Sequence, residues 1–123
     1  MFVVAVTLTA KPGHEHELVE GVRKLVNAAR GRPGLRYSKV ARRVEDGRTR
    51  LLILGEYETS ADAMRFADYD QAAAMPLAPL IESAEGGMGE AIDIEFDPDT
   101  WQPVFEAVEQ GREPGGAPSA DVM

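Results

Sequence analysis

The chain has 123 residues, of which 44% are hydrophobic and 28% charged, the composition of a single soluble globular domain. Its net charge of −8 argues against nucleic-acid binding, because that needs a basic face to displace counterions from phosphates. The absence of cysteine excludes disulfides, thiolate catalysis and iron–sulfur clusters. The absence of cysteine is compatible with a reducing cytoplasm, where we expect the protein. No apolar run is long enough to cross a bilayer, so we expect no membrane partner, and the charge predicts no nucleic-acid partner.

The first half of the chain predicts a strand, a helix and two further strands. Residues 2–9 are apolar at both alternating sets of positions, which indicates a strand covered on both faces. Residues 14–30 carry apolar side chains at helical spacing, and Pro33-Gly34 ends that helix. Residues 35–44 and 50–58 follow as strands.

The two later strands form a predicted hairpin, with Asp46-Gly47 as its turn. Four arginines flank this turn, and we expect them to be a solvated edge of the sheet rather than a nucleic-acid site: Arg42, Arg43, Arg48 and Arg50.

The second half of the chain begins with a helix for which Thr59 or Ser60 is the N-cap, and which breaks at Tyr69-Asp70. A further helical piece over 71–82 contains two prolines that make it short or kinked. The remaining expectations are a flexible loop at 85–87, a last strand at 90–96 and a short helix within 100–109.

The order β-α-β-β-α-β predicts an α+β, ferredoxin-like domain: a four-stranded antiparallel sheet with both helices on one face. The other face then needs a cover, and we expect a homodimer in which two sheets pack face to face. The domain would span 1–96, an appendage over 97–110 would contact the partner, and 111–123 would be a disordered tail.

Three sequence blocks carry a resemblance to a known family: Lys11-Pro12-Gly13, RPGLRY at 32–37 and EYETSADA at 56–63. With the first and last predicted strands, they resemble the antibiotic biosynthesis monooxygenase family of the dimeric α/β-barrel superfamily, over residues 2–96. The resemblance implies a dimer, a pocket between sheet and helices, and cofactor-free oxidation of an aromatic, polyketide-like substrate.

Haem-degrading members of that family use an asparagine on the first strand, a tryptophan after the third and a histidine in the second helical region. Here the first strand has no asparagine, Tyr57 takes the tryptophan position, and Asp70 or a neighbour takes the histidine position. We therefore expect no haem and no bound cofactor, while an external reduced flavin stays open. His14 and His16 are spaced so that they point apart, so we expect no metal site there.

The resemblance also implies a set of site residues. Tyr57 lies at a pocket position, although core packing with a bonded hydroxyl is an equal alternative. Tyr69 and Asp70 lie at the helix break where family pockets open. Arg65 lies on the helix before them, and a solvated face is its favoured alternative. These four are the candidate catalytic residues. The candidate substrate-binding residues, whose alternative is mostly the core, are Tyr37, Phe66, Met64, Met75 and Met88.

Cofactor-free oxygenation needs a substrate that supplies its own electrons, such as a phenol or an anthrone. The protein must then deprotonate that substrate, stabilise the anion and exclude water. Tyr57, Tyr69 and Arg65 would stabilise the enolate, and Asp70 would be the base if burial strengthens it. Two alternatives remain: a non-redox cyclase or isomerase using the same groups, and a non-catalytic dimeric ligand-binding or accessory protein.

Overall fold

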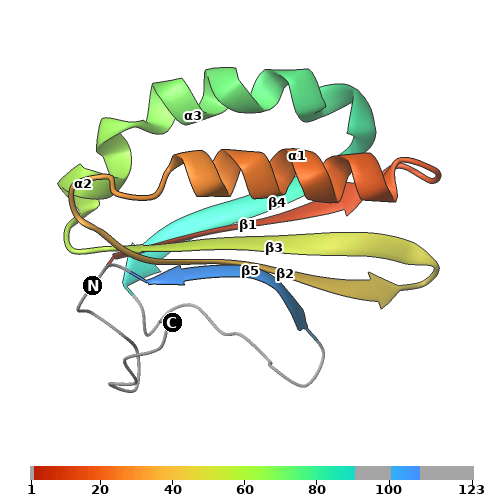
Figure 1. Ribbon diagram of the computed structural model, residues 1–123, viewed down its shortest axis with the longest axis horizontal. Coiled ribbons are helices and arrows are strands. Elements are labelled where there is room, and N and C mark those ends of the chain that lie inside the picture. Colours follow the sequence, from red (N-terminus) through yellow and green to blue (C-terminus); the bar gives the residue numbers. More distant parts are fainter. Residues whose placement is uncertain (1, 91–100, 109–123) are drawn as a thin grey trace.

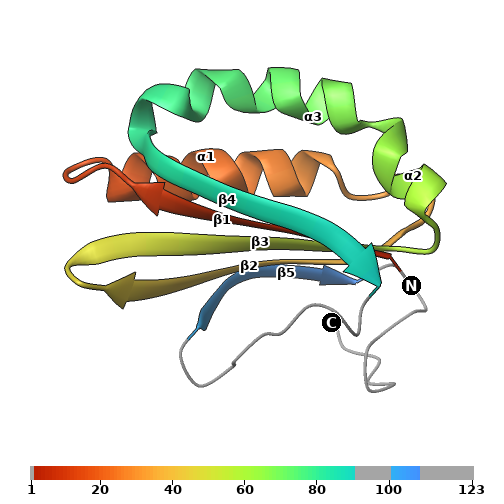
Figure 2. The same cartoon turned by 180° about the vertical axis from the view of Figure 1, so that it is seen from behind.

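The computed structural model describes residues 2–90 and 101–108. One antiparallel sheet with strand order β4-β1-β3-β2-β5 carries the helices on one face, as Figure 1 and the view from behind in Figure 2 show. The elements are β1 (Phe2–Ala10), α1 (Glu15–Ala28), β2 (Leu35–Glu45), β3 (Arg48–Tyr57), α2 (Ser60–Arg65), α3 (Ala67–Ala74), the 3-10 helix η1 (Met75–Leu80), β4 (Ile81–Glu90) and β5 (Gln102–Val108). The ferredoxin-like α+β fold is confirmed, with five strands rather than the four expected.

Local chemistry sets the middle of the chain as predicted. Asp46 and Gly47 both adopt positive φ, 53° and 75°, which is the backbone of the tight turns that match strand twist in a hairpin. Thr59 caps α2, because its side-chain oxygen accepts a hydrogen bond from the Asp62 backbone N–H at 3.1 Å. Hairpin and cap together bring the chain back over the sheet.

The core lies between α1 and the helix-facing side of the sheet. Its largest fully buried side chains come from α1, β2 and β3: Leu18, Val22, Val40 and Leu51. Burying each such side chain stabilises the fold by roughly 1.5–3 kcal/mol. A second cluster, formed by Leu35, Tyr57 and Ala63, packs against Phe2 and Val4 at the end of the sheet where α2 begins. This second cluster is the base of the candidate site.

The fourth strand begins nine residues earlier than the sequence indicated. Ile81–Glu90, which includes the expected loop at 85–87, pairs with β1 as β4. It is an edge strand with exposed side chains through most of its length, so it lacks the alternation that predicts a strand, and backbone pairing sets it instead. Residues 91–96 of the expected last strand lie outside the described residues.

The short helix expected within 100–109 is wrong, because Gln102–Val108 forms β5 along β2. The register shifts between Val40, opposite Phe105, and Ala41, opposite Pro103, which leaves Val104 as an extra residue. Pairing with β2 sets this strand, although its apolar residues do not alternate along the sequence. Residues 97–100 and the tail at 111–123 lie outside the described part of the chain.

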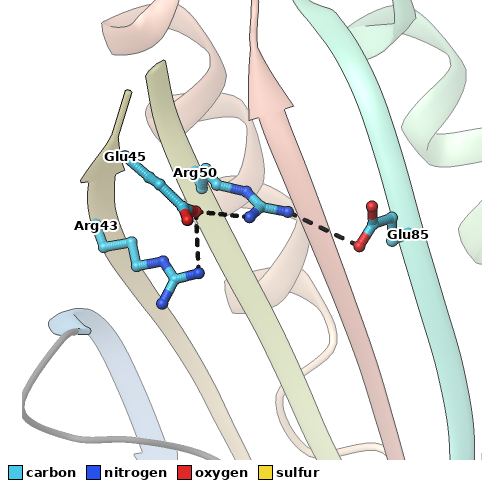
Figure 3. A network of polar contacts seen from close by, with 4 residues as sticks. All are labelled: Arg43, Glu45, Arg50 and Glu85. Atoms are coloured by element: carbon cyan, nitrogen blue, oxygen red, sulfur yellow. Dashed lines mark hydrogen bonds and ion pairs between the residues drawn. The ribbon is translucent and has the colours of Figure 1, made fainter. Parts of the chain in front are cut away.

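The sheet face away from the helices carries a polar network near the β2–β3 hairpin (Figure 3). Glu45 lies between two arginines, 3.0 Å from Arg43 and 2.8 Å from Arg50, and Arg50 also lies 3.8 Å from Glu85 of β4. The Arg43 guanidinium stacks 4.6 Å from the centroid of the Trp101 ring. Arg43 and Arg50 therefore lie across the sheet face, half-buried, and not at a solvated edge.

Further along this face, the apolar side chains are already shielded within one chain. Val3, Ala41, Leu52 and Leu54 are all buried. Neighbouring residues of a strand point to opposite faces, so Val3 lies on the face away from the helices and Val4 on the helix-facing side. In the described residues, no helix is long and apolar enough to span a membrane.

Candidate functional site

Arg32, in the loop between α1 and β2, is the centre of the candidate site. Only 10% of its side chain is exposed. The guanidinium donates two hydrogen bonds to the Asp70 carboxylate, from Nη1 to Oδ2 at 2.9 Å and from Nη2 to Oδ1 at 2.6 Å. A parallel two-point pair of this kind is strong and fixes orientation. It ties the start of α3 to the loop that leads into β2.

Aromatic rings surround the same guanidinium. It lies 4.5 Å from the centroid of the Phe66 ring and 5.7 Å from that of Tyr69, within the range of cation–π attraction. The Tyr57 phenol also lies close enough to interact with the guanidinium. Because arginine has no acceptor, the Tyr57 oxygen must accept, and the Tyr57 O–H stays available to donate elsewhere.

Burial raises the pKa of Tyr57, and the Arg32 charge opposes that rise only in part. Tyr57 is therefore a neutral phenol at physiological pH, as a hydrogen-bond donor must be. The pKa of Arg32 is raised as well, chiefly by its bond to Asp70, so the guanidinium stays charged. The site thus presents one fixed cation and one neutral O–H donor.

The break between α2 and α3 produces this grouping. Phe66 ends α2 and precedes α3, and the Asp70 N–H donates to the Phe66 carbonyl at 2.8 Å. Residues three and four apart share one side of a helix, so Phe66, Tyr69 and Asp70 point together toward Arg32. The sequence predicted the break at Tyr69-Asp70, three to four residues too late.

Accessible apolar surface lies on the helix-facing side of β1 and β4. Helix α3 buries none of its residues, although it belongs to the helical layer over the sheet (Figure 2). On the strands, Val4 and Val6 are only partly buried, and Met88, which pairs with Val4, is 50% exposed. A flat apolar ligand has a surface to contact here.

Four of the nominated residues meet at Arg32: Tyr57, Tyr69, Asp70 and Phe66. Arg65 does not, because it pairs with Asp62 at 3.4 Å and is half exposed. Met64 and Met75 are also exposed and share no enclosed site with Met88. Their exposure also contradicts the alternative, in which these methionines belong to the core.

Tyr37 lies on the opposite side of the sheet from Tyr57. The β2–β3 register shifts between Leu35, opposite Tyr57, and Tyr37, opposite Glu56. A bulge of this kind reverses the facing of every later residue, so parity counted from Leu35 misplaces Tyr37. Tyr37 cannot share the surroundings of Tyr57 within one chain.

Asp70 also differs from expectation, since its role as a base depended on burial. Half of its side chain is exposed, and both carboxylate oxygens are bound by Arg32. Arg32 itself was missed, because Arg-Pro-Gly reads as a helix stop and nothing in the spacing reveals a partner on another element. His14 binds Glu17 at 2.8 Å, and no group of three or more metal-ligating side chains occurs among residues 2–90 and 101–108.

Solved structures share this fold. A protein from Nitrosomonas europaea named "putative antibiotic biosynthesis monooxygenase" aligns with a TM-score of 0.65 at 19% identity, covering 75% of this chain and 99% of that one. A protein from Pseudomonas aeruginosa aligns with a TM-score of 0.61 at 18% identity, covering 72% of this chain and 90% of that one. A protein from Caulobacter crescentus, also named "putative antibiotic biosynthesis monooxygenase", aligns with a TM-score of 0.59 at 20% identity, covering 73% of this chain and 88% of that one. At these identities the likeness shows the fold alone.

A search of the curated proteins finds no match. The sequence profile of the antibiotic biosynthesis monooxygenase family, by contrast, matches residues 1–75, which include the loop with Arg32, strand β3 with Tyr57 and helix α3 with Asp70. That is more than half of the chain, and the chain therefore belongs to the antibiotic biosynthesis monooxygenase family.

Proposed function

We propose that the protein is a cofactor-independent monooxygenase that oxidises a phenol- or anthrone-type aromatic compound, of the kind found among polyketides. The observation that carries this proposal is the buried Arg32 guanidinium, which joins the Tyr57 phenol, the Asp70 carboxylate and the Phe66 ring at one point. Family membership and the accessible apolar surface around Met88 give it further support.

The reaction balances without an external reductant. Oxidation of an anthrone takes one O₂, converts the ring CH₂ to a carbonyl and releases one H₂O. Both electrons that reduce the second oxygen atom come from the two C–H bonds that are lost. The protein must therefore favour the enolate, which reacts with oxygen, over the keto form.

The site residues would divide this work. Arg32 and the free Tyr57 O–H would stabilise the enolate oxygen, because fixed donors aimed at developing charge cost no reorganisation during reaction. Once the Asp70 carboxylate is released from Arg32, it would take the proton from the ring carbon. Phe66 and Tyr69 would contact the substrate ring face, where aromatic pairs stack favourably.

We further propose that the protein is a homodimer through the sheet face away from the helices. The support is membership of the antibiotic biosynthesis monooxygenase family, whose members commonly form homodimers. Sedimentation equilibrium should give twice the mass of one chain. A mass equal to a single chain at micromolar concentration contradicts this assembly.

Oxygen uptake tests the activity. Purified protein with an anthrone should consume one O₂ per quinone formed, well above the autoxidation rate, and Arg32→Gln should remove the excess. Arg30→Gln is the matched control, because Arg30 lies two residues earlier, is exposed and bonds only weakly to Asn27 at 3.4 Å. Turnover that continues anaerobically would instead identify a non-redox cyclase or isomerase.

A further inference from the structure

The Arg32–Asp70 pair combines a buried cation with an accessible anion. Only 10% of the Arg32 side chain is exposed, whereas half of Asp70 is. Because the Arg32 side chain is largely shielded from solvent, losing its counter-ion without a replacement would be destabilising. Asp70 is the partner that solvent can reach and can therefore be replaced.

Helix α3 is built so that Asp70 can leave at little cost. None of its residues is buried, and its ends are interrupted, by Phe66 before it and by the proline-containing η1 after it. Asp70 also lies in the first turn of α3, where the helix dipole stabilises a negative charge without help from Arg32. The carboxylate thus remains supported after it leaves.

The groups around Arg32 match an aromatic anion rather than a simple one. The guanidinium lies against Phe66 and near Tyr69, while Tyr57 keeps one O–H to donate. A phenolate or carboxylate attached to a flat ring could accept from Arg32 and Tyr57 while the ring stacks beside Phe66. A small inorganic anion would gain only the charge interaction.

We propose, on the basis of the function proposed above, that Asp70 occupies in the ligand-free protein the position that an aromatic oxyanion takes on Arg32, so that the substrate exchanges with Asp70. The exchange keeps the buried cation neutralised throughout. The displacing anion is a phenolate or carboxylate that the substrate carries on arrival, because the enolate forms only after the freed Asp70 has taken its proton from the bound ring. In the resting protein, Asp70 therefore acts as a built-in competitor of the substrate.

Equilibrium binding of naphthoate, followed by fluorescence, tests the exchange, with the uncharged naphthylmethanol of the same ring isomer as comparison. Asp70→Asn removes the competing charge, so it should tighten naphthoate binding about 10-fold and leave naphthylmethanol binding unchanged. Arg32→Gln should abolish the preference for naphthoate. Asp68→Asn is the matched control, because Asp68 carries the same charge in the same first turn of α3.

Each other outcome overturns the exchange. Equal tightening by Asp70→Asn and Asp68→Asn would mean a general charge effect, and equal tightening toward both compounds would mean steric blocking. Naphthoate affinity that Asp70→Asn leaves unchanged, or naphthoate binding by none of these proteins, is equally contrary. Thermal unfolding of each variant confirms that it is folded. Oxygen uptake with an anthrone is measured separately, so the exchange can fail while the proposed oxygenase activity stands.

Discussion

Arg32 and Asp70 lie 38 residues apart in the sequence, yet the guanidinium of one holds both carboxylate oxygens of the other at 2.9 and 2.6 Å. This pair joins the loop before β2 to helix α3. It also brings Tyr57, Phe66 and Tyr69 around one buried cation. The candidate site is therefore a product of the tertiary fold and not of any local motif.

Arg32→Lys should destabilise the protein, because an ammonium cannot reproduce the two parallel bonds or the flat stacking on Phe66. We expect a loss of about 1–2 kcal/mol in the free energy of unfolding, which urea titration measures. Arg30→Lys, at an exposed position nearby, should change it by less than about 0.5 kcal/mol. Equal effects of the two substitutions would show that the Arg32 pair contributes nothing specific.

Tyr57→Phe keeps the buried ring but removes the hydroxyl that interacts with Arg32. Stability should fall by only about 1 kcal/mol, since Arg32 retains Asp70. The rate of oxygen uptake should fall about 100-fold, as for the loss of one donor to a developing oxyanion. Unfolding curves and oxygen-electrode rates on the same preparations separate the two effects. A variant with full activity would reduce Tyr57 to a core residue.

Gly34→Ala and Gly31→Ala form a matched pair, because both glycines adopt a φ of 84°. Each alanine should cost about 1 kcal/mol for a left-handed backbone. At Gly31 a Cβ would meet nothing within 4 Å, whereas at Gly34 it would collide with the Asp62 side chain beside the cap of α2. Gly34→Ala should therefore unfold at a clearly lower urea concentration. Equal urea midpoints for the two variants would mean that α2 moves aside without a measurable loss of stability.

Glu56 makes stability depend on pH, because desolvation raises its pKa above the usual value of 4.5, and the N-terminal amino group opposes this only in part. A carboxyl with a raised folded pKa binds protons more tightly in the folded state. Its contribution is therefore full below the unfolded pKa and is lost as pH rises through the folded pKa.

Glu56→Gln removes this penalty, since the amide stays uncharged at every pH. The variant should gain stability over the natural protein as pH rises from about 4 to about 7, as followed by urea unfolding at each pH. Taking the difference between the two proteins cancels the other titrating groups. A difference that is flat with pH, or that shrinks as pH rises, would mean that Glu56 is not desolvated in solution.

The sequence predicted the elements that carry their own signals. The strand at the N-terminus, the first helix, the Asp46-Gly47 turn and the Thr59 cap all depend on local spacing or local hydrogen bonds. Strand β4 was not predicted, because pairing with β1 forms it despite its glycine-rich composition. Strand β5 was missed because its apolar residues have helix-like spacing in the sequence, whereas its pairing with β2 is a tertiary contact.

The candidate site was predictable in part. Tyr57, Tyr69 and Asp70 were nominated from a family resemblance, and they do lie together. Arg32 was not, because its role depends on a contact between distant elements. Tyr37 was assigned to the same site, but the β2 bulge turns it to the opposite face. That bulge cannot be recognised from the pattern of apolar and polar residues in the sequence.

Oxygen uptake by the purified protein with an anthrone, compared between the natural chain, Arg32→Gln and Arg30→Gln, tests the account most directly. We predict one O₂ consumed per quinone formed by the natural chain and by Arg30→Gln, and only the autoxidation rate with Arg32→Gln. Uptake that is independent of Arg32, or that never exceeds autoxidation with the natural chain, would contradict an oxygenase site centred on that residue.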